Sequence, residues 1–209
     1  MNGMCILDER NGPTNGHIQL ILGPMFSGKT TELMRRMRRY KVANLSCLVV
    51  KYAKDNRYDV HNVMTHDQAS MTAVKATALV NIDNEAEMHD VIGVDEGQFS
   101  MQCIYAGVLI FQFSDVVAFA ERMASKGKVV IVAALDGTFQ RKGFANILEL
   151  VPYSESVIKL QAVCMMCYRG AAFTKRTGNE TEVEVIGGAE KYMAVCRTCY
   201  TKDPEDKEN

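Results

Sequence analysis

The stretch GPMFSGKTTELMRR, residues 23–36, follows directly on an apolar run at residues 18–22. Small residues after a strand let backbone N–H groups point at phosphate oxygens, and the start of the following helix adds positive potential. A lysine and a hydroxyl side chain at the end of such a loop reach the β- and γ-phosphates and a magnesium ion. The stretch therefore predicts a phosphate-binding loop for a nucleoside triphosphate, whereas a glycine-rich turn that merely begins a helix is the alternative. The predicted loop comprises Gly23, Pro24, Met25, Phe26, Ser27, Gly28, Lys29 and Thr30.

Apolar runs alternate with amphipathic segments on either side of this loop. Runs that are apolar on both faces suit a parallel sheet covered by helices, and the intervening segments are long enough for crossovers. We therefore expect an α/β fold, a RecA-like P-loop domain with a parallel sheet flanked by helices, over residues 17–160 after a loose tail at 1–16. The expected strands are 17–22, 47–51, 91–95, 129–135 and 157–160, and the expected helices include 30–41 and 115–126.

Composition limits the classes of protein that the chain can represent. It has 209 residues, of which 47% are hydrophobic, and a formal net charge of −1. Such a chain buries one sizeable core and has no global field that would attract nucleic acid or a membrane surface. The apolar runs fall short of the roughly 20 residues that span a bilayer, and no secretory pattern opens the sequence. We expect a cytoplasmic protein.

A second apolar run ends in acidic residues, in the sequence VIGVDEGQ at 91–98. A carboxylate at the end of a buried strand beside the phosphate loop suits Asp95 as a partner of magnesium-bound water. Glu96 points elsewhere and is suited to take a proton from an attacking oxygen. That oxygen could belong to a substrate hydroxyl or to water, so the pair fits a small-molecule kinase and an ATP-driven motor equally. Two acids that merely cap the next helix are a further reading.

Four of the seven cysteines form two pairs, Cys164-x2-Cys167 and Cys196-x2-Cys199, with 28 residues between them. Four thiolates at this spacing suit tetrahedral Zn²⁺, and a full set of four protein ligands indicates a structural metal. Two disulfides or four unrelated thiols are the alternatives. The pairs define a small zinc-ribbon and lasso module at residues 161–200, whose loop contains an alternating stretch at 182–186 followed by two glycines. The charged stretch at 201–209 is expected to be a tail.

The motifs taken together resemble the cellular, zinc-containing type of the thymidine kinase family. The match runs in order from about residue 17 to residue 200. Motifs of this length are far more specific than a phosphate loop alone. They are GPMFSGKTTEL (23–33), YAKDNRY (52–58), THD (65–67), VIGVDEGQF (91–99), VIVAALDGTFQRK (130–142), LQAVCMMC (160–167) and EVEVIGGAEKYMAVCRTCY (182–200).

The resemblance implies transfer of the γ-phosphoryl group of ATP to the 5′-hydroxyl of thymidine, which yields dTMP for DNA precursor salvage. Glu96 would receive the hydroxyl proton, and Asp95 would hold the shell of Mg²⁺ through water. Lys29 and Thr30 would grip the phosphates. The remaining nucleotide contacts that we carry over are Asp55, Arg57 and Gln98, of which Arg57 would offset charge on the moving group.

The resemblance also implies a base pocket under a backbone lid. Phe139 and Tyr192 would cover the faces of the thymine ring and exclude water, and the lid backbone would read its edge. Further implications are a homotetramer and feedback inhibition by dTTP, with no nucleic-acid or membrane partner. The pocket residues carried over are Met25, Phe99, Leu135, Phe139, Phe144, Thr174 and Tyr192, with Val183, Glu184, Val185, Ile186 and Gly187 in the lid.

One segment departs from the family pattern, the apolar stretch MQCIYAGVLIFQF at residues 101–113. It lies close to Glu96 in sequence, so the activity of this chain depends on how it is accommodated. A retained intron or faulty gene model is our hypothesis, and a genuine surface loop is the competing one. A smaller departure is Gly143, where the family usually has proline.

A nucleotide-driven motor and a zinc-dependent nucleic-acid binder are the other classes of function. The ending Lys207-Glu208-Asn209 weakly resembles a degradation signal.

Overall fold

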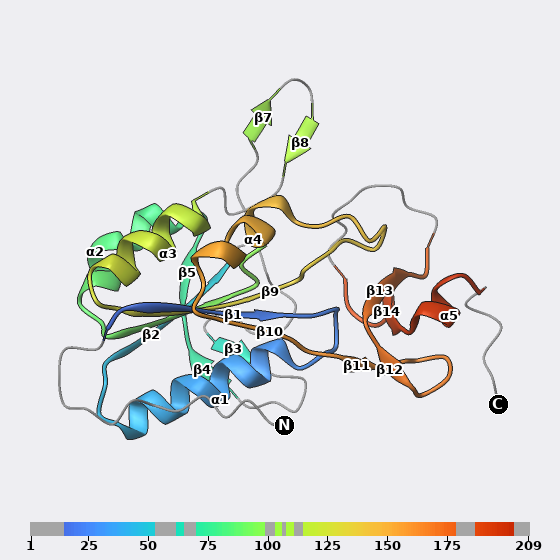
Figure 1. Ribbon diagram of the computed structural model, residues 1–209, viewed down its shortest axis with the longest axis horizontal. Coiled ribbons are helices and arrows are strands. Elements are labelled where there is room, and N and C mark those ends of the chain that lie inside the picture. Colours follow the sequence, from blue (N-terminus) through green and yellow to red (C-terminus); the bar gives the residue numbers. More distant parts are fainter. Residues whose placement is uncertain are drawn as a thin grey trace.

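The computed structural model describes residues 15–52, 62–64, 70–98, 103–105, 108–110, 115–178 and 187–202. Its centre is a six-stranded parallel sheet in the order β10-β1-β9-β6-β2-β5 (Figure 1). Five strands lie within one residue of the predicted runs, whereas β5 is too short to stand out as an apolar run. The α/β fold class is therefore confirmed. The strands are β1 (His17–Leu22), β2 (Cys47–Tyr52), β5 (Val74–Ala76), β6 (Val91–Asp95), β9 (Val129–Ala134) and β10 (Ser156–Lys159).

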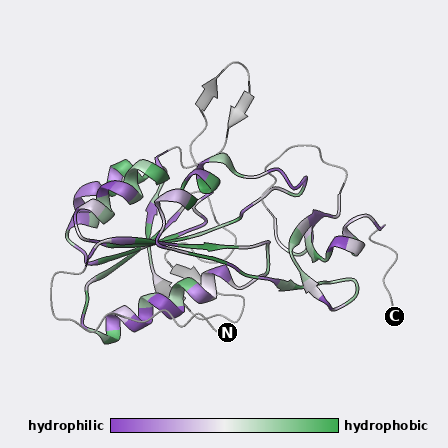
Figure 2. Ribbon diagram, in the orientation of Figure 1, coloured by the Kyte–Doolittle hydropathy of each residue, from purple (hydrophilic) through white to green (hydrophobic). Residues whose placement is uncertain are grey.

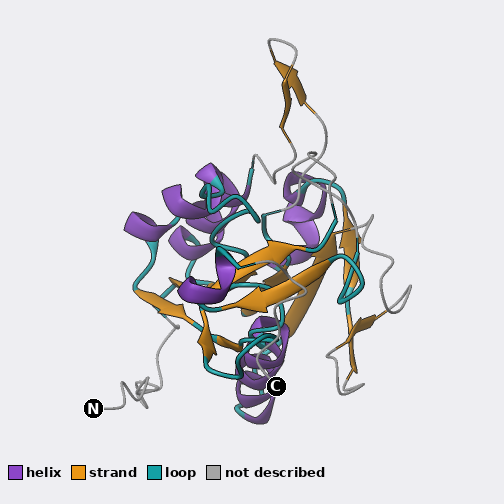
Figure 3. Ribbon diagram, turned by 90° about the vertical axis from the view of Figure 1, so that its right-hand side faces the viewer, coloured by secondary structure: helices purple, strands orange, loops and turns teal. Residues whose placement is uncertain are grey.

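Helices cover both faces of this sheet (Figures 1 and 3). The long helix α1 (Lys29–Val42) packs on one face through a core that contains Leu33 and Met37. On the opposite face, α3 (Val116–Ser125) buries Phe119 and Met123 completely. Each such side chain stabilises the fold by about 1.5–3 kcal/mol relative to an exposed one. Shorter elements complete this layer, namely η1 (Leu79–Ile82), α2 (Asp83–Glu87), α4 (Ala145–Glu149) and η2 (Val151–Tyr153).

The sequence pattern of β1 shows why helices are needed on both sides. Ile18 and Leu20 belong to the core under α3, whereas Ile21 belongs to the core under α1. All six residues of β9 are buried. Figure 2 shows these strands as predominantly hydrophobic, while α1 alternates between hydrophilic and hydrophobic residues along its length. A sheet of this kind is stable when both faces are covered.

The strand register brings the ends of three strands together. Leu22 at the end of β1 lies opposite Ala134 of β9, and Val94 of β6 lies opposite Val132 of β9. The strand β9 therefore separates the strand before the phosphate loop from the strand that ends in Asp95. This is the strand order of a RecA-like sheet. Ligands of open parallel sheets bind outside these carboxyl ends, so the candidate site lies at this edge.

The cysteine-containing segment folds beside the same edge (Figure 1). Its core contains Met166, Ala194 and Val195, and the half-buried Phe26 of the phosphate loop packs against it. The division of the chain at residue 160 stays a prediction. The elements of this module are β11 (Ala162–Val163), β12 (Gly170–Ala171), β13 (Phe173–Arg176), β14 (Tyr192–Val195) and α5 (Arg197–Tyr200).

Besides the pairs β11-β12 and β13-β14 of the cysteine module, the described residues form two further short antiparallel pairs outside the main sheet. They are β3 (Asn62–Met64) with β4 (Ser70–Thr72), and β7 (Cys103–Tyr105) with β8 (Val108–Ile110). The second pair lies within the stretch 101–113 and projects away from the sheet in both views (Figures 1 and 3). Within the described ranges, no helix is long and apolar enough to cross a membrane.

Candidate active site

The phosphate loop connects β1 to α1 and contains two glycines with left-handed backbone. Gly23 has φ of 152°, and a Cβ atom there would lie 2.6 Å from Ser27 Oγ and 2.9 Å from Leu160 O. Gly28 has φ of 81° and is the N-cap of α1. It has no side chain that could bond the first helical N–H groups, so these groups remain suited to an anion. The geometry explains why glycine occupies both positions.

Lys29 lies inside this loop and is almost completely buried. Its Nζ donates a hydrogen bond to the carbonyl oxygen of Pro24 over 2.8 Å. The ammonium group therefore crosses the loop on its inner side. A phosphate oxygen is a stronger acceptor than a neutral carbonyl, so a bound triphosphate can draw this ammonium toward itself.

Thr30 and Asp95 meet at the edge of the sheet. Thr30 Oγ1 donates to the Asp95 carboxylate, at 3.1 Å from Oδ1 and 3.2 Å from Oδ2. The contact joins the first turn of α1 to the end of β6. A hydroxyl and a carboxylate held this closely can share one hydrated magnesium ion, the hydroxyl directly and the carboxylate through water.

Glu96 follows Asp95 with φ of 56°, which is unusual for a residue with a side chain. This turn sends the two adjacent carboxylates in different directions. Gln98 fixes the second one, because its Nε2 donates to Glu96 Oε2 while its Oε1 accepts from the Leu135 N–H over 2.9 Å. Gln98 is fully buried. Its predicted contact with nucleotide stays a prediction, and its observed contacts are with the acid and with the end of β9.

Residues of the cysteine module reach the phosphate loop and the loop after β9. The backbone N–H of Met25 donates to Thr174 Oγ1 over 3.0 Å. Tyr200 donates its hydroxyl hydrogen to the carbonyl oxygen of Phe139 over 2.6 Å. The predicted pocket residues Met25, Phe139 and Thr174 are thus linked across the two parts of the chain.

Two further contacts bring Tyr192 to the same place. Arg176 Cζ lies 3.9 Å from the centre of the Phe139 ring, and Arg176 Nη2 donates to the Tyr192 hydroxyl over 2.7 Å. Phe144 instead packs against the core beneath α3, and its role in the pocket stays a prediction. Arg176 and Tyr200 were not predicted as site residues, because Arg176 lies outside the quoted motifs and Tyr200, although it ends the last of them, is not one of the cysteine ligands.

The four predicted cysteine ligands converge. Their sulfur atoms all lie within 4.8 Å of one another, and all four are free thiols rather than disulfides. Zinc–sulfur bonds of about 2.3 Å place tetrahedral ligands about 3.8 Å apart, and Cys167 Sγ lies 3.7 Å from Cys196 Sγ. The disulfide alternative is thereby excluded, and the cluster fits a tetrahedral metal ion.

The surroundings of these thiols are electrostatically unequal. Hydrogen bonds from the backbone and guanidinium of Arg169 lower the pKa of Cys167 to about 6. Burial, with the neighbouring sulfurs, raises the pKa of Cys199 to about 12. The Cys167 thiol is therefore ready to ionise at neutral pH, whereas the Cys199 thiol requires a compensating cation. A divalent metal ion supplies that charge.

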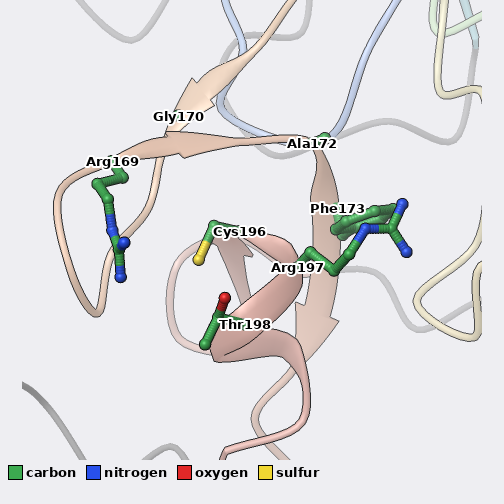
Figure 4. A pocket seen from close by; sticks show the side chains of 7 residues that line it. All are labelled: Arg169, Gly170, Ala172, Phe173, Cys196, Arg197 and Thr198. Atoms are coloured by element: carbon green, nitrogen blue, oxygen red, sulfur yellow. The ribbon is translucent and has the colours of Figure 1, made fainter.

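A hollow of about 350 Å³ lies in this module (Figure 4). Among the residues that the structure describes, none of those predicted to bind nucleotide or nucleoside lines it. Arg169 and Arg197 point away from each other in this view, and Cys196 lies between them. The lining residues are Arg169, Gly170, Ala172, Phe173, Cys196, Arg197 and Thr198.

Several predicted site residues lie outside the described residues. They are Asp55, Arg57, Phe99, Val183, Glu184, Val185 and Ile186. Gly187 is described and precedes the turn in which the Lys191 N–H donates to the Gly188 carbonyl oxygen over 3.1 Å. Their roles stay predictions.

Comparison with known proteins agrees with this arrangement. A family model described as thymidine kinase matches residues 16–200. "Thymidine kinase, cytosolic" of Homo sapiens is 57% identical over 216 residues, covering 100% of this chain and 86% of the human protein. The protein of the same name from Gallus gallus is 57% identical over 204 residues, covering 95% and 85%. "Thymidine kinase" of Vaccinia virus (strain Western Reserve) is 55% identical over 185 residues, covering 88% and 97%.

Among solved structures, the flagellar accessory protein FlaH from Methanocaldococcus jannaschii aligns with 92% of this chain and 84% of its own. The identity is 11% and the TM-score is 0.47, a likeness too weak to support an argument. The family match, in contrast, spans the phosphate loop, the acidic strand and all four cysteines. The chain therefore belongs to the thymidine kinase family.

Proposed function

We propose that this chain transfers the γ-phosphoryl group of ATP to the 5′-hydroxyl of thymidine, giving dTMP and ADP in deoxynucleotide salvage. The observation that carries the proposal is the meeting of Thr30 with Asp95 beside a separately held Glu96, in a chain of this family. One carboxylate is then available to the metal-bound phosphates and the other to the acceptor.

The phosphate loop and Lys29 would hold the β- and γ-phosphates of ATP. Mg²⁺, when bound by Thr30 and through water by Asp95, neutralises charge on the phosphates. Arg57 and Asp55 would complete the contacts with nucleotide, as the resemblance implies. Positioning and electrostatic stabilisation, rather than covalent chemistry by the protein, are the main means of catalysis in such transfers.

Glu96 would act as the general base for the acceptor. Its carboxylate takes the proton of the 5′-hydroxyl as the oxygen forms a bond to the γ-phosphorus, and the bond to the β–γ bridging oxygen breaks. The bond to Gln98 and the left-handed backbone orient this carboxylate away from Asp95. A base held before substrate arrives needs little rearrangement in the transition state.

The thymine ring would lie between side chains that the structure already links. Phe139 and Tyr192 are joined through Arg176, and Met25 is joined to Thr174. The lid from Val183 to Gly187 would supply backbone groups to the edge of the base. Closure over the base would also exclude water, which otherwise competes for the phosphoryl group.

The four-cysteine cluster would hold a structural Zn²⁺ ion, because four sulfur ligands leave no open position for a substrate. A cytoplasmic location accords with the names of the relatives and with free thiols. The proposal further includes a homotetramer and inhibition by dTTP, whose base would occupy the thymidine site with its phosphates in the donor loop.

A direct test is to incubate the purified chain with labelled ATP, magnesium and each of the four deoxynucleosides. We expect labelled monophosphate from thymidine and little from the three other deoxynucleosides. ATP turnover that requires single-stranded DNA and ignores thymidine would indicate a motor instead. Retention on DNA with a steep salt dependence would indicate a nucleic-acid binder.

A further inference from the structure

We propose that Arg176 is a positioning residue of the nucleoside site, which holds Phe139 and Tyr192 in the geometry that thymidine requires. The inference rests on the proposed function, because it takes these two side chains as walls of the base pocket. Arg176 is predicted to touch neither the reacting atoms nor the phosphates. Its effect should therefore appear in nucleoside affinity rather than in the chemical step.

The first support is the burial of this charged side chain. Arg176 is 6% exposed, and it lies on β13 directly opposite Tyr192 on β14. Arginine is rarely buried to this degree, because desolvation of the guanidinium is costly unless its surroundings compensate. The site thus keeps the charged Arg176 at a position where an apolar side chain would be buried at a lower desolvation cost.

The second support is the hydrogen bond to Tyr192. Arg176 Nη2 lies 2.7 Å from the phenol oxygen, which accepts the bond. A hydroxyl that accepts from a cation directs its own hydrogen elsewhere, and the polarised O–H becomes a better donor. Arg176 therefore sets both the position of the Tyr192 ring and the direction in which its hydroxyl donates.

The third support is the stacking on Phe139. The guanidinium carbon lies 3.9 Å from the centre of that ring and 5.1 Å from the centre of the Tyr192 ring. A flat guanidinium stacks on an aromatic face while its N–H groups remain free to bond in its own plane, which the ammonium of lysine cannot do. One side chain therefore contacts both predicted walls.

Phe139 needs such a support because of its place in the chain. It lies in the loop that follows β9, which is closed by a bond from the Thr138 N–H to the Lys142 carbonyl oxygen over 2.8 Å. Tyr200 fixes the backbone of this loop by bonding the Phe139 carbonyl oxygen. Arg176 fixes the plane of the ring. The cysteine module thus controls both the position and the tilt of the aromatic wall.

Steady-state kinetics of Arg176→Met and Arg176→Lys test the proposal. We expect Arg176→Met to raise KM for thymidine about tenfold or more, with kcat within about threefold and KM for ATP unchanged, as for loss of uniform binding. Arg176→Lys keeps the charge but not the stacking and should raise the same KM about threefold or more. Bound metal should remain at one zinc per chain in both variants.

Arg197→Met is the matched control, because Arg197 stacks on Phe173 in the same module at 5.1 Å. It should leave thymidine KM unchanged.

A Phe139→Leu and Arg176→Met double variant tests whether the arginine acts through the ring. Thymidine KM of the double variant should exceed that of the more affected single variant by less than about twofold. A multiplicative increase would overturn action through Phe139. The positioning role would be overturned if Arg176→Met had a thymidine KM within about twofold of the wild type. It would also be overturned if both Michaelis constants rose equally and zinc was lost. If Arg176→Met does not fold, a wild-type KM in Arg176→Lys overturns it. A wild-type chain that phosphorylates no thymidine overturns the proposed function itself.

Discussion

The side-chain amide of Gln98 donates a hydrogen bond to the carboxylate of Glu96, while its oxygen accepts from the backbone of Leu135. The proposed base is thereby tied to the end of the neighbouring strand β9. A buried amide with two defined partners has one orientation, so the direction of the carboxylate is set before any substrate binds.

Glu96→Gln should leave ATP bound and lower turnover about a hundredfold or more, because the amide cannot accept the hydroxyl proton. The measurement is kcat with thymidine, together with ATP affinity by equilibrium binding. Glu149→Gln, at an exposed position on α4, is the control and should have wild-type turnover. Near-normal turnover of the Glu96 variant would show that another group takes the proton.

Lys29→Ala should abolish phosphoryl transfer, because the cation that reaches the β- and γ-phosphates is lost. The stabilisation of the folded chain by ATP and magnesium should also disappear from thermal unfolding curves, since a ligand stabilises the state that binds it. Lys41→Ala removes an exposed lysine from the last turn of the same helix and should change neither result. An active Lys29 variant would mean that the loop does not bind phosphate as proposed.

Cys196→Ser should release the metal and raise thymidine KM before it affects ATP binding. The reason is that the module carries Thr174, Arg176 and Tyr192, whereas the phosphate loop belongs to the sheet. Zinc content per chain and both Michaelis constants are the measurements. Cys47→Ser alters a half-buried thiol in β2 and is the control. A Cys196 variant with full zinc content would contradict the four-thiolate site.

Deletion of residues 101–113 should leave the melting temperature and thymidine kinetics close to those of the full chain. In the part of this stretch that the structure describes, β7 and β8 pair with each other and with no strand of the six-stranded sheet. A loop longer by about this number of residues costs little closure entropy, of order 1 kcal/mol. Thermal unfolding and kcat/KM compare the two chains. A deletion that unfolds the protein would show that the segment packs against it.

Asp90→Asn should lower the free energy of unfolding at neutral pH by about 1 kcal/mol. Hydrogen bonds from the side chain and backbone of Ser46 lower the pKa of Asp90 below its usual value. Because the folded pKa is the lower one, the carboxylate stabilises the fold above the unfolded pKa, and this contribution is lost as pH falls through the folded pKa.

Urea unfolding of the wild type and of Asp90→Asn between pH 7 and pH 2 measures this effect. The two curves should converge at the acidic end of the range. Ser46→Ala removes the same contact from the other side, since Ser46 Oγ lies 2.7 Å from Asp90 Oδ2. A double variant should be little less stable than either single one. A difference between wild type and Asp90→Asn that is independent of pH would contradict the assignment.

Much of the fold was predictable because its signals are local. The strands β1, β6 and β9 are largely apolar runs, and the phosphate loop has a fixed pattern of residues. The four cysteines were predictable as a cluster for the same reason, since their pairs have the spacing of metal ligands. The acid pair was predictable from its place at the end of a buried run.

The contacts that join the two parts of the chain were not predictable in this way. Arg176 and Tyr200 act on Phe139 only because β13, β14 and α5 fold against the loop after β9. Nothing in the spacing of these residues indicates that packing. The choice between water and an alcohol as acceptor is likewise decided by the family match rather than by Asp95 and Glu96 alone.

The position of β9 between β1 and β6 has a consequence for the tolerance of this enzyme to change. Neighbouring strands lie about 4.8 Å apart, so β1, which leads into the donor loop, and the acidic strand β6 are held roughly 10 Å from each other by main-chain bonding. That separation is independent of which aliphatic side chains fill the core. Substitutions such as Val132→Ile should therefore alter the melting temperature without changing the distance between β1 and β6. The spacing of the catalytic groups can thus persist while much of the core sequence changes.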